Sequence, residues 1–256
     1  MSFEPAKVWF TGWFLRFMAE RIIEHNRSVI VAADVEVAKL SALVRETCLV
    51  EGIGGYKIGL SLALEEGLGK VVCTVKEHTG LPVIYDHQKA GNDIPAMGSV
   101  FAKVCKQSGV DAVILFPFAG EVTERDWIKA CRDNGLGVLV GAHMTQPKFL
   151  LSEGGSIADE APERIFTIAA EEGVSDFVVP GNKVELVGYY KKLIENILGK
   201  DNFTLYAPGF ITQGGKISDF AVAAGNKWHA IVGSAIYKAV DMHKTAEQMT
   251  RQIWKD

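Results

Sequence analysis

The sequence predicts a (β/α)8 barrel, or TIM barrel, on three observations. Eight short apolar runs recur along the 256 residues, and a longer segment with helical spacing follows each of them. Most runs are continuously apolar instead of alternating, which is typical of parallel strands covered on both faces. No linker, repeat or low-complexity tract divides the chain. Because right-handed crossovers close eight such units into a barrel, we expect one domain over residues 1–256; an open doubly wound sheet is the alternative.

The expected elements follow one another in a regular order. The strands are 28–34, 55–59, 82–86, 111–117, 136–143, 175–181, 203–209 and 229–234. Two of the segments between them have one apolar helical face, formed by Val37, Leu40, Leu43 and Val44 in 37–48 and by Leu186, Tyr190, Leu193 and Ile197 in 184–198. Ahead of the first strand, residues 1–27 predict an amphipathic helix that caps one end of the barrel, since charged residues interrupt its apolar run.

Composition narrows the class of function. The net charge is −4 with acids and bases interspersed, which argues against a nucleic-acid surface or a polybasic membrane surface and favours a small-molecule ligand. The four cysteines lie far apart, so we expect reduced thiols in a cytoplasmic protein and no metal site. No stretch approaches the roughly 20 apolar residues that a membrane helix needs.

Charged residues stand where the first three strands end. Asp34, Lys57 and Asp86 occupy these ends, and Lys89 follows closely. Burying an unpaired charge costs several kcal/mol, so an alternating network of acids and lysines is expected at the carboxyl ends of the strands, where barrel enzymes carry their chemistry. A lysine held protonated by carboxylates can deliver a proton to a developing carbanion. The structural alternative is a salt-bridge network that only plugs the barrel mouth.

The last two strands end in glycine-bearing turns. Gln213, Gly214 and Gly215 follow the seventh strand, and Gly233 with Ser234 follows the eighth. Loops at these two places commonly bind phosphate through backbone N–H groups, which predicts an anion site; ordinary tight turns are the alternative.

With these residues the chain resembles a divergent member of the orotidine 5'-monophosphate decarboxylase family. The resemblance runs from Ser28 to Ala239 and rests on the stretches 31-VAAD, 56-YKIGLSL, 86-DHQKAGNDIP, 144-MTQP, 208-PGFITQGG and 232-VGSAIY. The acid–lysine–acid stretch followed by Ile-Pro is the most specific of them. The resemblance implies a carboxy-lyase of pyrimidine biosynthesis that uses no cofactor or metal and converts orotidine monophosphate to UMP.

The resemblance also implies catalytic roles for individual residues. Asp86 would lie against the substrate carboxylate, and Lys89 would stabilise and protonate the carbanion at C6. Lys57 and Asp34 would complete the charge network, with Asp34 also near the ribose. Asp93 would reach into the site of a neighbouring subunit, which implies a homodimer.

Substrate-binding positions follow in the same way. Thr145 resembles the hydroxyl residue at the pyrimidine edge. The phosphate side would be formed by Gln213, Gly214, Gly215, Gly233 and Ser234, and Pro208 is a further substrate-binding position. His143 ends the fifth expected strand and is a further candidate for a ligand contact.

Two departures from the family pattern leave alternatives open. The family spacing D-x-K-x-x-D is here Asp86-x-x-Lys89-x-x-x-Asp93, so a bulge or loop around Gly91 must absorb the extra residues. Where the family places a phosphate-binding arginine after the last strand, this chain has Ser234. Such changes favour a non-catalytic nucleotide-binding homologue as one alternative.

The charge that the missing arginine would supply has two candidate sources, Lys216 and Lys183. A second alternative function is the Mg²⁺-dependent sugar-phosphate branch of the same suprafamily. That branch places a glutamate at the end of the second strand, whereas Lys57 stands there in this chain and would oppose a cation.

Overall fold

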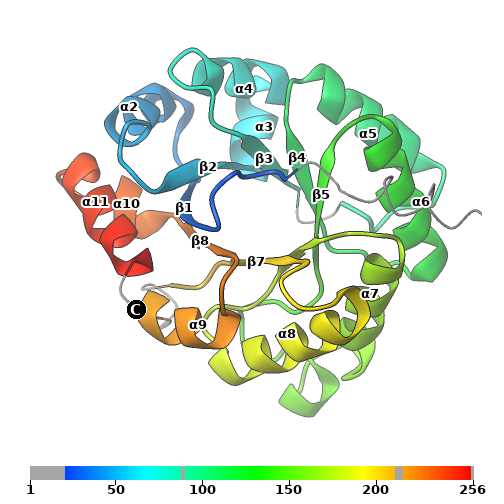
Figure 1. Ribbon diagram of the computed structural model, residues 1–256. Helices are drawn as coiled ribbons and strands as arrows, with labels where there is room; N and C mark the ends of the chain where they lie inside the picture. The colour runs from blue at the N-terminus through cyan, green and yellow to red at the C-terminus, as the bar shows by residue number, and fades with distance from the viewer. Residues whose placement is uncertain (1–20, 88–89, 211–215, 255–256) are drawn as a thin grey trace, which may run out of the picture.

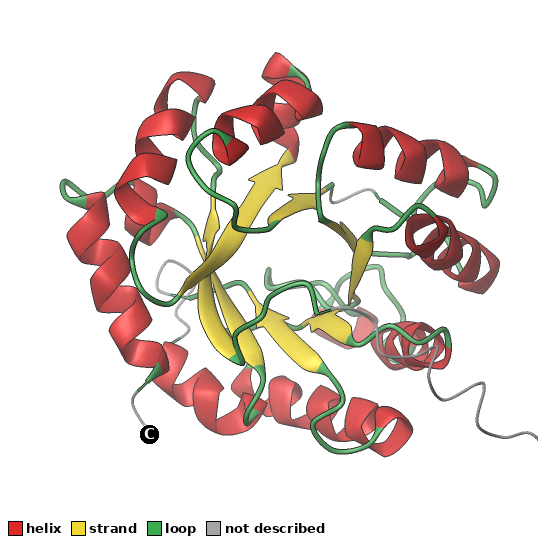
Figure 2. Ribbon diagram, turned by 45° about the horizontal axis from the view of Figure 1, so that its top comes forward, coloured by secondary structure: helices red, strands yellow, loops and turns green. Residues whose placement is uncertain are grey.

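The structure is a computed structural model that describes residues 21–87, 90–210 and 216–254. Eight parallel strands form a closed barrel in chain order, and helices surround it (Figures 1 and 2). The strands are β1 (Arg27–Ala32), β2 (Ile53–Gly59), β3 (Val83–Asp86), β4 (Ala112–Leu115), β5 (Gly137–Gly141), β6 (Asp176–Val178), β7 (Thr204–Ala207) and β8 (Trp228–Val232). Because β1 pairs in parallel with β8, the barrel prediction is confirmed and the open doubly wound sheet is excluded.

The helices fill the connections between the strands. They are α2 (Val37–Thr47), α3 (Leu60–Glu66), α4 (Leu68–Lys76), α5 (Met97–Gln107), α6 (Glu121–Asp133), α7 (Ala161–Glu171), α8 (Val184–Leu198), α9 (Ile217–Ala224), α10 (Ser234–Tyr237) and α11 (Met242–Ile253), with a short 3-10 turn η1 (Leu151–Glu153) before α7. Within the described ranges, no helix is both long enough and apolar enough to cross a membrane.

The strands bury apolar side chains on both faces, as their continuous hydrophobicity predicted. One cluster fills the barrel interior and includes Ile30, Ile84 and Leu139. The other lies between the barrel and the helices and includes Tyr56 and Phe177. Each such side chain contributes roughly 1.5–3 kcal/mol when it is fully buried, so these two layers hold the strand ends in fixed positions.

The helix expected over residues 1–27 falls mostly outside the described residues. The part that is described, 21–26, is not helical, and β1 begins at Arg27. Ile23 is almost fully buried and packs with the apolar cluster of the barrel interior. This segment therefore contributes to closing the barrel without forming helix.

The expected helical faces are confirmed for one helix and shifted for another. In α2, Leu40, Leu43 and Val44 are buried. In α8 the fully buried residues are Val187, Tyr190 and Ile194, whereas the expected face included Ile197, which is 39% exposed. Tyr190, which is hydrogen-bonded to His143 after β5, belongs to both faces, so the face of α8 is turned about this residue towards Val187 and Ile194.

Candidate active site

A cavity of about 250 Å³ opens at the carboxyl ends of the strands. Three charged side chains line it and form one ion triplet: Asp34 just after β1, Lys57 in β2 and Asp86 at the end of β3. Lys57 Nζ lies 3.1 Å from Asp86 Oδ2 and 3.3 Å from Asp34 Oδ1. The side chains of Lys57 and Asp86 are each 10% exposed, whereas that of Asp34 is 47% exposed. The expected network of acids and a lysine is thus present among these three residues.

Strand alternation explains why the three side chains converge. In β2, Tyr56 and Ile58 pack outward against the helices, so Lys57 between them points into the barrel. In β3, Ile84 points inward and Asp86, two residues later, does the same.

The charge of Lys57 is stabilised by its two partners. Burial by itself lowers the pKa of Lys57, but the attraction and hydrogen bonds of Asp86 and Asp34 outweigh it, so the pKa lies above its ordinary value. The side chain is therefore a permanent cation near neutral pH. It offsets two carboxylates that would otherwise repel each other at this end of the barrel.

Gly59, at the end of β2, makes room for the triplet, and sequence reasoning did not single it out. A Cβ atom at this position would lie 2.6 Å from Asp34 Oδ1 and 3.8 Å from Lys57 Nζ. Any side chain there would displace the Asp34 carboxylate from the lysine. The sequence signal is weak, because β2 contains two more glycines, Gly54 and Gly55, and a glycine in a strand indicates only a close approach of other atoms.

The remaining cavity wall combines the expected binding residues with apolar ones. Thr145, Pro208, Gly233 and Ser234 all line it, as the sequence predicted, and so does His143. Apolar and aromatic side chains that sequence reasoning missed complete the wall; they include Ile114, Phe116, Met144, Val178, Ile231 and Tyr237. Ile114, Val178 and Ile231 lie in strands, where alternation sets their direction. Met144 and Tyr237 lie beyond the strands, where no such alternation predicts which way a side chain points.

The segment after β3 carries the altered acid–lysine–acid spacing. Lys89 lies outside the described residues. Gly91 has a φ of +84°, and a Cβ there would lie 3.1 Å from Pro117 Cα, so this position favours glycine on both counts. The turn at Gly91 agrees with the expected place for the extra residues. Asp93 is exposed, accepts a hydrogen bond from the Ile94 N–H and does not line the cavity.

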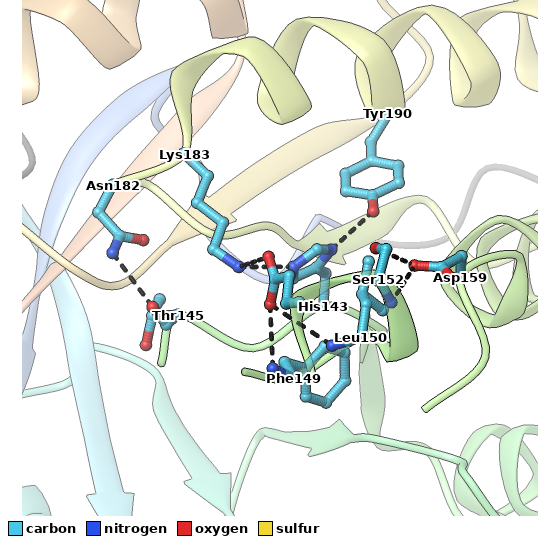
Figure 3. A network of polar contacts seen from close by, with 10 residues as sticks. His143, Thr145, Phe149, Leu150, Ser152, Asp159, Asn182, Lys183 and Tyr190 are labelled. Carbon is cyan, nitrogen blue, oxygen red and sulfur yellow. Dashed lines mark hydrogen bonds and ion pairs between the residues drawn. The ribbon is translucent and has the colours of Figure 1, made fainter. Parts of the chain in front are cut away.

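The two lysines considered for the phosphate side differ in position. Gln213, Gly214 and Gly215 lie outside the described residues. Lys216 follows them as an exposed residue at the start of α9. Lys183 is held by Glu153 and His143 and is not among the residues that line the cavity (Figure 3).

A larger cavity, of about 460 Å³, lies at the opposite end of the barrel. It is lined by residues at the starts of β3, β5 and β6, together with Arg21, Lys106 and Arg132. We assign the candidate active site to the smaller cavity because barrels of this kind place their chemistry at the carboxyl ends of the strands, where the ion triplet lies. In the described part of the chain, no group of three or more metal-binding side chains is gathered.

Comparisons with known proteins identify the family of the chain. A profile of the orotidine 5'-phosphate decarboxylase / HUMPS family matches residues 27–249. The chain belongs to this family. Two curated relatives named orotidine 5'-phosphate decarboxylase, from Methanosarcina barkeri and Methanosarcina mazei, are 32% and 33% identical to it. Each alignment covers 90% of this chain, with 96% and 97% of the respective relative.

Solved structures support the same family. The orotidine 5'-phosphate decarboxylase of Pyrococcus horikoshii superimposes with a TM-score of 0.73 at 26% identity, covering 89% of this chain and all of the other. The enzyme of Methanocaldococcus jannaschii, solved with the inhibitor BMP, gives a TM-score of 0.77 at 23% identity over 90% of this chain and all of the other, and shows the shared fold. With about 32% identity to the curated relatives over 90% of its length, the chain is a divergent member of the family.

Proposed function

We propose that the protein is a carboxy-lyase that converts orotidine 5'-monophosphate to UMP without a cofactor, a step of pyrimidine biosynthesis. The observation that carries the proposal is the Asp34–Lys57–Asp86 triplet inside a cavity at the carboxyl ends of the strands. Family membership over nearly the whole chain agrees with it. The arrangement supplies fixed charge at the place where charge develops in the reaction.

In the proposed mechanism the C6–carboxylate bond breaks and its electron pair remains on C6 as CO2 leaves. Lys89, three residues after Asp86 in the sequence, donates a proton from its ammonium group to C6. Asp86 lies beside the departing carboxylate, and Lys57 holds Asp86 in place while balancing its charge. Stabilisation of the carbanion by the neighbouring ammonium supplies the main catalytic effect, because it acts on the transition state more than on the bound substrate.

Substrate binding is assigned to the rest of the wall. Thr145 would contact the pyrimidine edge, and Asp34 the ribose. The phosphate would bind at Gln213, Gly214, Gly215, Gly233 and Ser234, and Pro208 would contact the substrate elsewhere on the cavity wall. Apolar side chains such as Ile114 and Val178 would exclude water around the reacting carboxylate, which strengthens each electrostatic contact there.

We also propose a homodimer in which Asp93 completes the neighbouring site. Asp93 is exposed and stands outside its own cavity. Beside it, large apolar side chains are exposed along α5 and at the start of α6, which lie next to each other (Figure 1). Val100 is 50% exposed, Val104 53% and Val122 67%. A patch of this kind, next to a residue proposed to act in a second subunit, fits a partner copy of the same chain.

The remaining parts of the proposal concern the whole chain. We propose that residues 1–256 form one domain, since the family profile spans 27–249 and the barrel closes within that range. The four cysteines are free thiols, which supports the proposed cytoplasmic location.

The decisive experiment is loss of orotidine monophosphate absorbance with the purified protein, with and without EDTA, beside Lys89→Ala. Turnover that resists EDTA and is abolished by the substitution would support the proposal. Nucleotide binding without turnover in the wild type would refute it in favour of a binding homologue. Loss of both, with Mg²⁺-dependent activity on sugar phosphates, would instead favour the other branch of the suprafamily.

A further inference from the structure

A second polar cluster adjoins the cavity and is centred on His143 and Lys183 (Figure 3). His143 follows β5 and is only 2% exposed, yet it lines the cavity. Its Nε2 atom lies 2.9 Å from Lys183 Nζ, and its Nδ1 atom lies 2.8 Å from Tyr190 Oη. Lys183 Nζ also donates to Glu153 Oε1 at 2.9 Å. These contacts join the loop after β5 to the loop after β6 and to α8.

The hydrogen-bonding directions in this cluster determine the state of the histidine. The ammonium group of Lys183 has donors and no acceptor, so His143 Nε2 must accept. Nδ1 then carries the ring proton and donates to Tyr190 Oη. Burial, together with the nearby Lys183 charge, lowers the pKa of His143 to about 4, which agrees with a neutral ring at pH 7.

Glu153 extends the cluster into the long loop before α7. Its Oε1 pairs with Lys183, and its Oε2 accepts from the backbone N–H of Phe149 at 2.9 Å. Hydrogen bonds from Lys183 and from this N–H lower the pKa of Glu153 to about 2. The ring of Phe149 lies against His143 with centroids 5.2 Å apart. The loop is thus fixed to the lysine by one carboxylate.

Thr145 is held from the same side. The Asn182 side-chain amide donates to the carbonyl oxygen of Thr145 at 3.2 Å. Asn182 directly precedes Lys183, so two neighbouring residues of one loop hold His143 and Thr145, which lie on either side of Met144. The backbone that presents Thr145 to the cavity therefore depends on the placement of residues 182 and 183.

We propose that Lys183 is a positioning residue, which through His143 and Glu153 holds the loop after β5 so that Thr145 meets the pyrimidine edge of the nucleotide. The inference deepens the proposed function and rests on it for the identity of the ligand. We assign Lys183 no contact with the substrate, because it is paired with Glu153 and is not among the residues that line the cavity. This also assigns Lys183 a role other than the phosphate contact that its sequence position allowed.

The first test compares two ligands that share a phosphate and a ribose. Lys183→Met is expected to weaken binding of UMP about tenfold, the effect of losing one good hydrogen bond at the base, and to leave binding of ribose 5-phosphate within twofold of the wild type. Equal losses for both ligands would overturn the proposal and make Lys183 a phosphate contact. Ser152→Ala is the matched control, because Ser152 lies on the same loop and bonds to Asp159 instead of Lys183.

The second test asks whether Lys183 acts through Thr145. For binding of UMP, Thr145→Ala and Lys183→Met are expected to be strongly non-additive, so that the double variant binds no more than about twofold more weakly than Thr145→Ala alone. Multiplied losses in the double variant would show that the two residues act independently and would refute the inference. Thermal unfolding of each variant checks that it is folded before its binding is compared.

The third test needs no ligand, so it separates this inference from the proposed function. Nitrogen-15 NMR of His143 in the wild type at pH 7 is expected to show a neutral ring protonated at Nδ1. Lys183→Met is expected to remove this preference and to increase hydrogen exchange at residues 142–146, while Ser152→Ala changes neither. An unchanged tautomer and unchanged exchange in Lys183→Met would overturn the positioning role, even in a protein that decarboxylates the nucleotide. Failure of the wild type to bind either ligand would refute the substrate part together with the proposed function.

Discussion

Removal of the Lys57 ammonium tests whether the ion triplet is held together as the structure indicates. The substitution Lys57→Met keeps the length and most of the volume of the side chain but removes the ammonium that lies 3.1 Å from Asp86. The Asp86 side chain is 10% exposed, so its charge is almost wholly withdrawn from water. Breaking a buried ion pair by removing one partner costs about 3–5 kcal/mol.

The expected size of the effect follows from the two partners. Asp34 is half exposed at 47%, so its share of the pairing is worth less than about 1 kcal/mol. Asp86 makes a further interaction in the protein, which places the loss at the lower end of the range. We expect Lys57→Met to lower the free energy of unfolding by about 3 kcal/mol. The double variant Lys57→Met/Asp86→Asn should regain part of this loss, because the negative charge that faces Lys57 is then removed together with the cation.

Urea unfolding followed by circular dichroism measures these differences at pH 7. Lys70→Met is the control, since Lys70 is a largely exposed lysine that pairs with Glu66 on the surface, and it should cost less than about 1 kcal/mol. A loss below 1 kcal/mol for Lys57→Met, or a double variant that is less stable than the single one, would refute the account of the triplet. Both variants should also lose decarboxylase activity, because Asp86 is either misplaced or neutralised.

The pH dependence of the same comparison follows from the raised pKa of Lys57. A group whose pKa is higher in the folded state stabilises the protein fully below its unfolded value, which is about 10.4 for lysine. The stability difference between wild type and Lys57→Met should therefore be constant from pH 6 to pH 9. It should shrink only as the pH rises through the folded pKa.

Three further predictions concern other parts of the fold. Glu124 is buried, one of its carboxyl oxygens has no hydrogen-bond partner, and burial raises its pKa to about 9. Because the buried carboxylate becomes more costly as the pH rises, Glu124→Gln should stabilise the protein more at pH 8 than at pH 5. Urea unfolding should show that this gain grows by up to about 4 kcal/mol between the two pH values. A Cβ on Gly141 would lie 2.3 Å from the Phe116 ring at the cavity wall, so Gly141→Ala should cost about 1–3 kcal/mol in thermal unfolding and raise KM for the nucleotide. Val100→Glu should convert the proposed dimer to monomer in sedimentation velocity, whereas Val222→Glu, on α9 at another exposed apolar position, should not.

Strand-based features of the site could be predicted from the sequence because alternation in a strand fixes the direction of each side chain. Once β2 and β3 are placed, Lys57 and Asp86 must both point into the barrel. Their order along the chain then makes them neighbours, since β2 and β3 pair directly. The ion triplet was therefore within reach of sequence reasoning, although the contribution of Gly59 was not, because that depends on a distance between atoms of two strands.

Helix faces were predicted less well, and α8 shows the reason. The apolar residues of α8 surround most of its circumference, so spacing alone admits more than one buried face. Tyr190 belongs to both the expected and the observed face, and the two differ in that Val187 and Ile194 pack in the core. That packing joins residues far apart in the chain, as does the hydrogen bond between Tyr190 and His143, 47 positions apart, and a local pattern does not contain such contacts.

Lys57 and Lys183 show the same limit of local sequence patterns for charged side chains. Lys57 stands within a strand, where alternation directs it into the cavity and towards two carboxylates. Lys183 stands five residues beyond the end of β6, in a loop that has no such alternation, and the sequence allowed it to be a phosphate contact. In the fold, Lys183 is not among the residues that line the cavity. It pairs with Glu153, and His143 accepts a hydrogen bond from it. A local pattern therefore predicts the position of a charge within a strand, as for Lys57 beside Asp34 and Asp86, but not that of a charge in a loop, as for Lys183 beside Glu153 and His143.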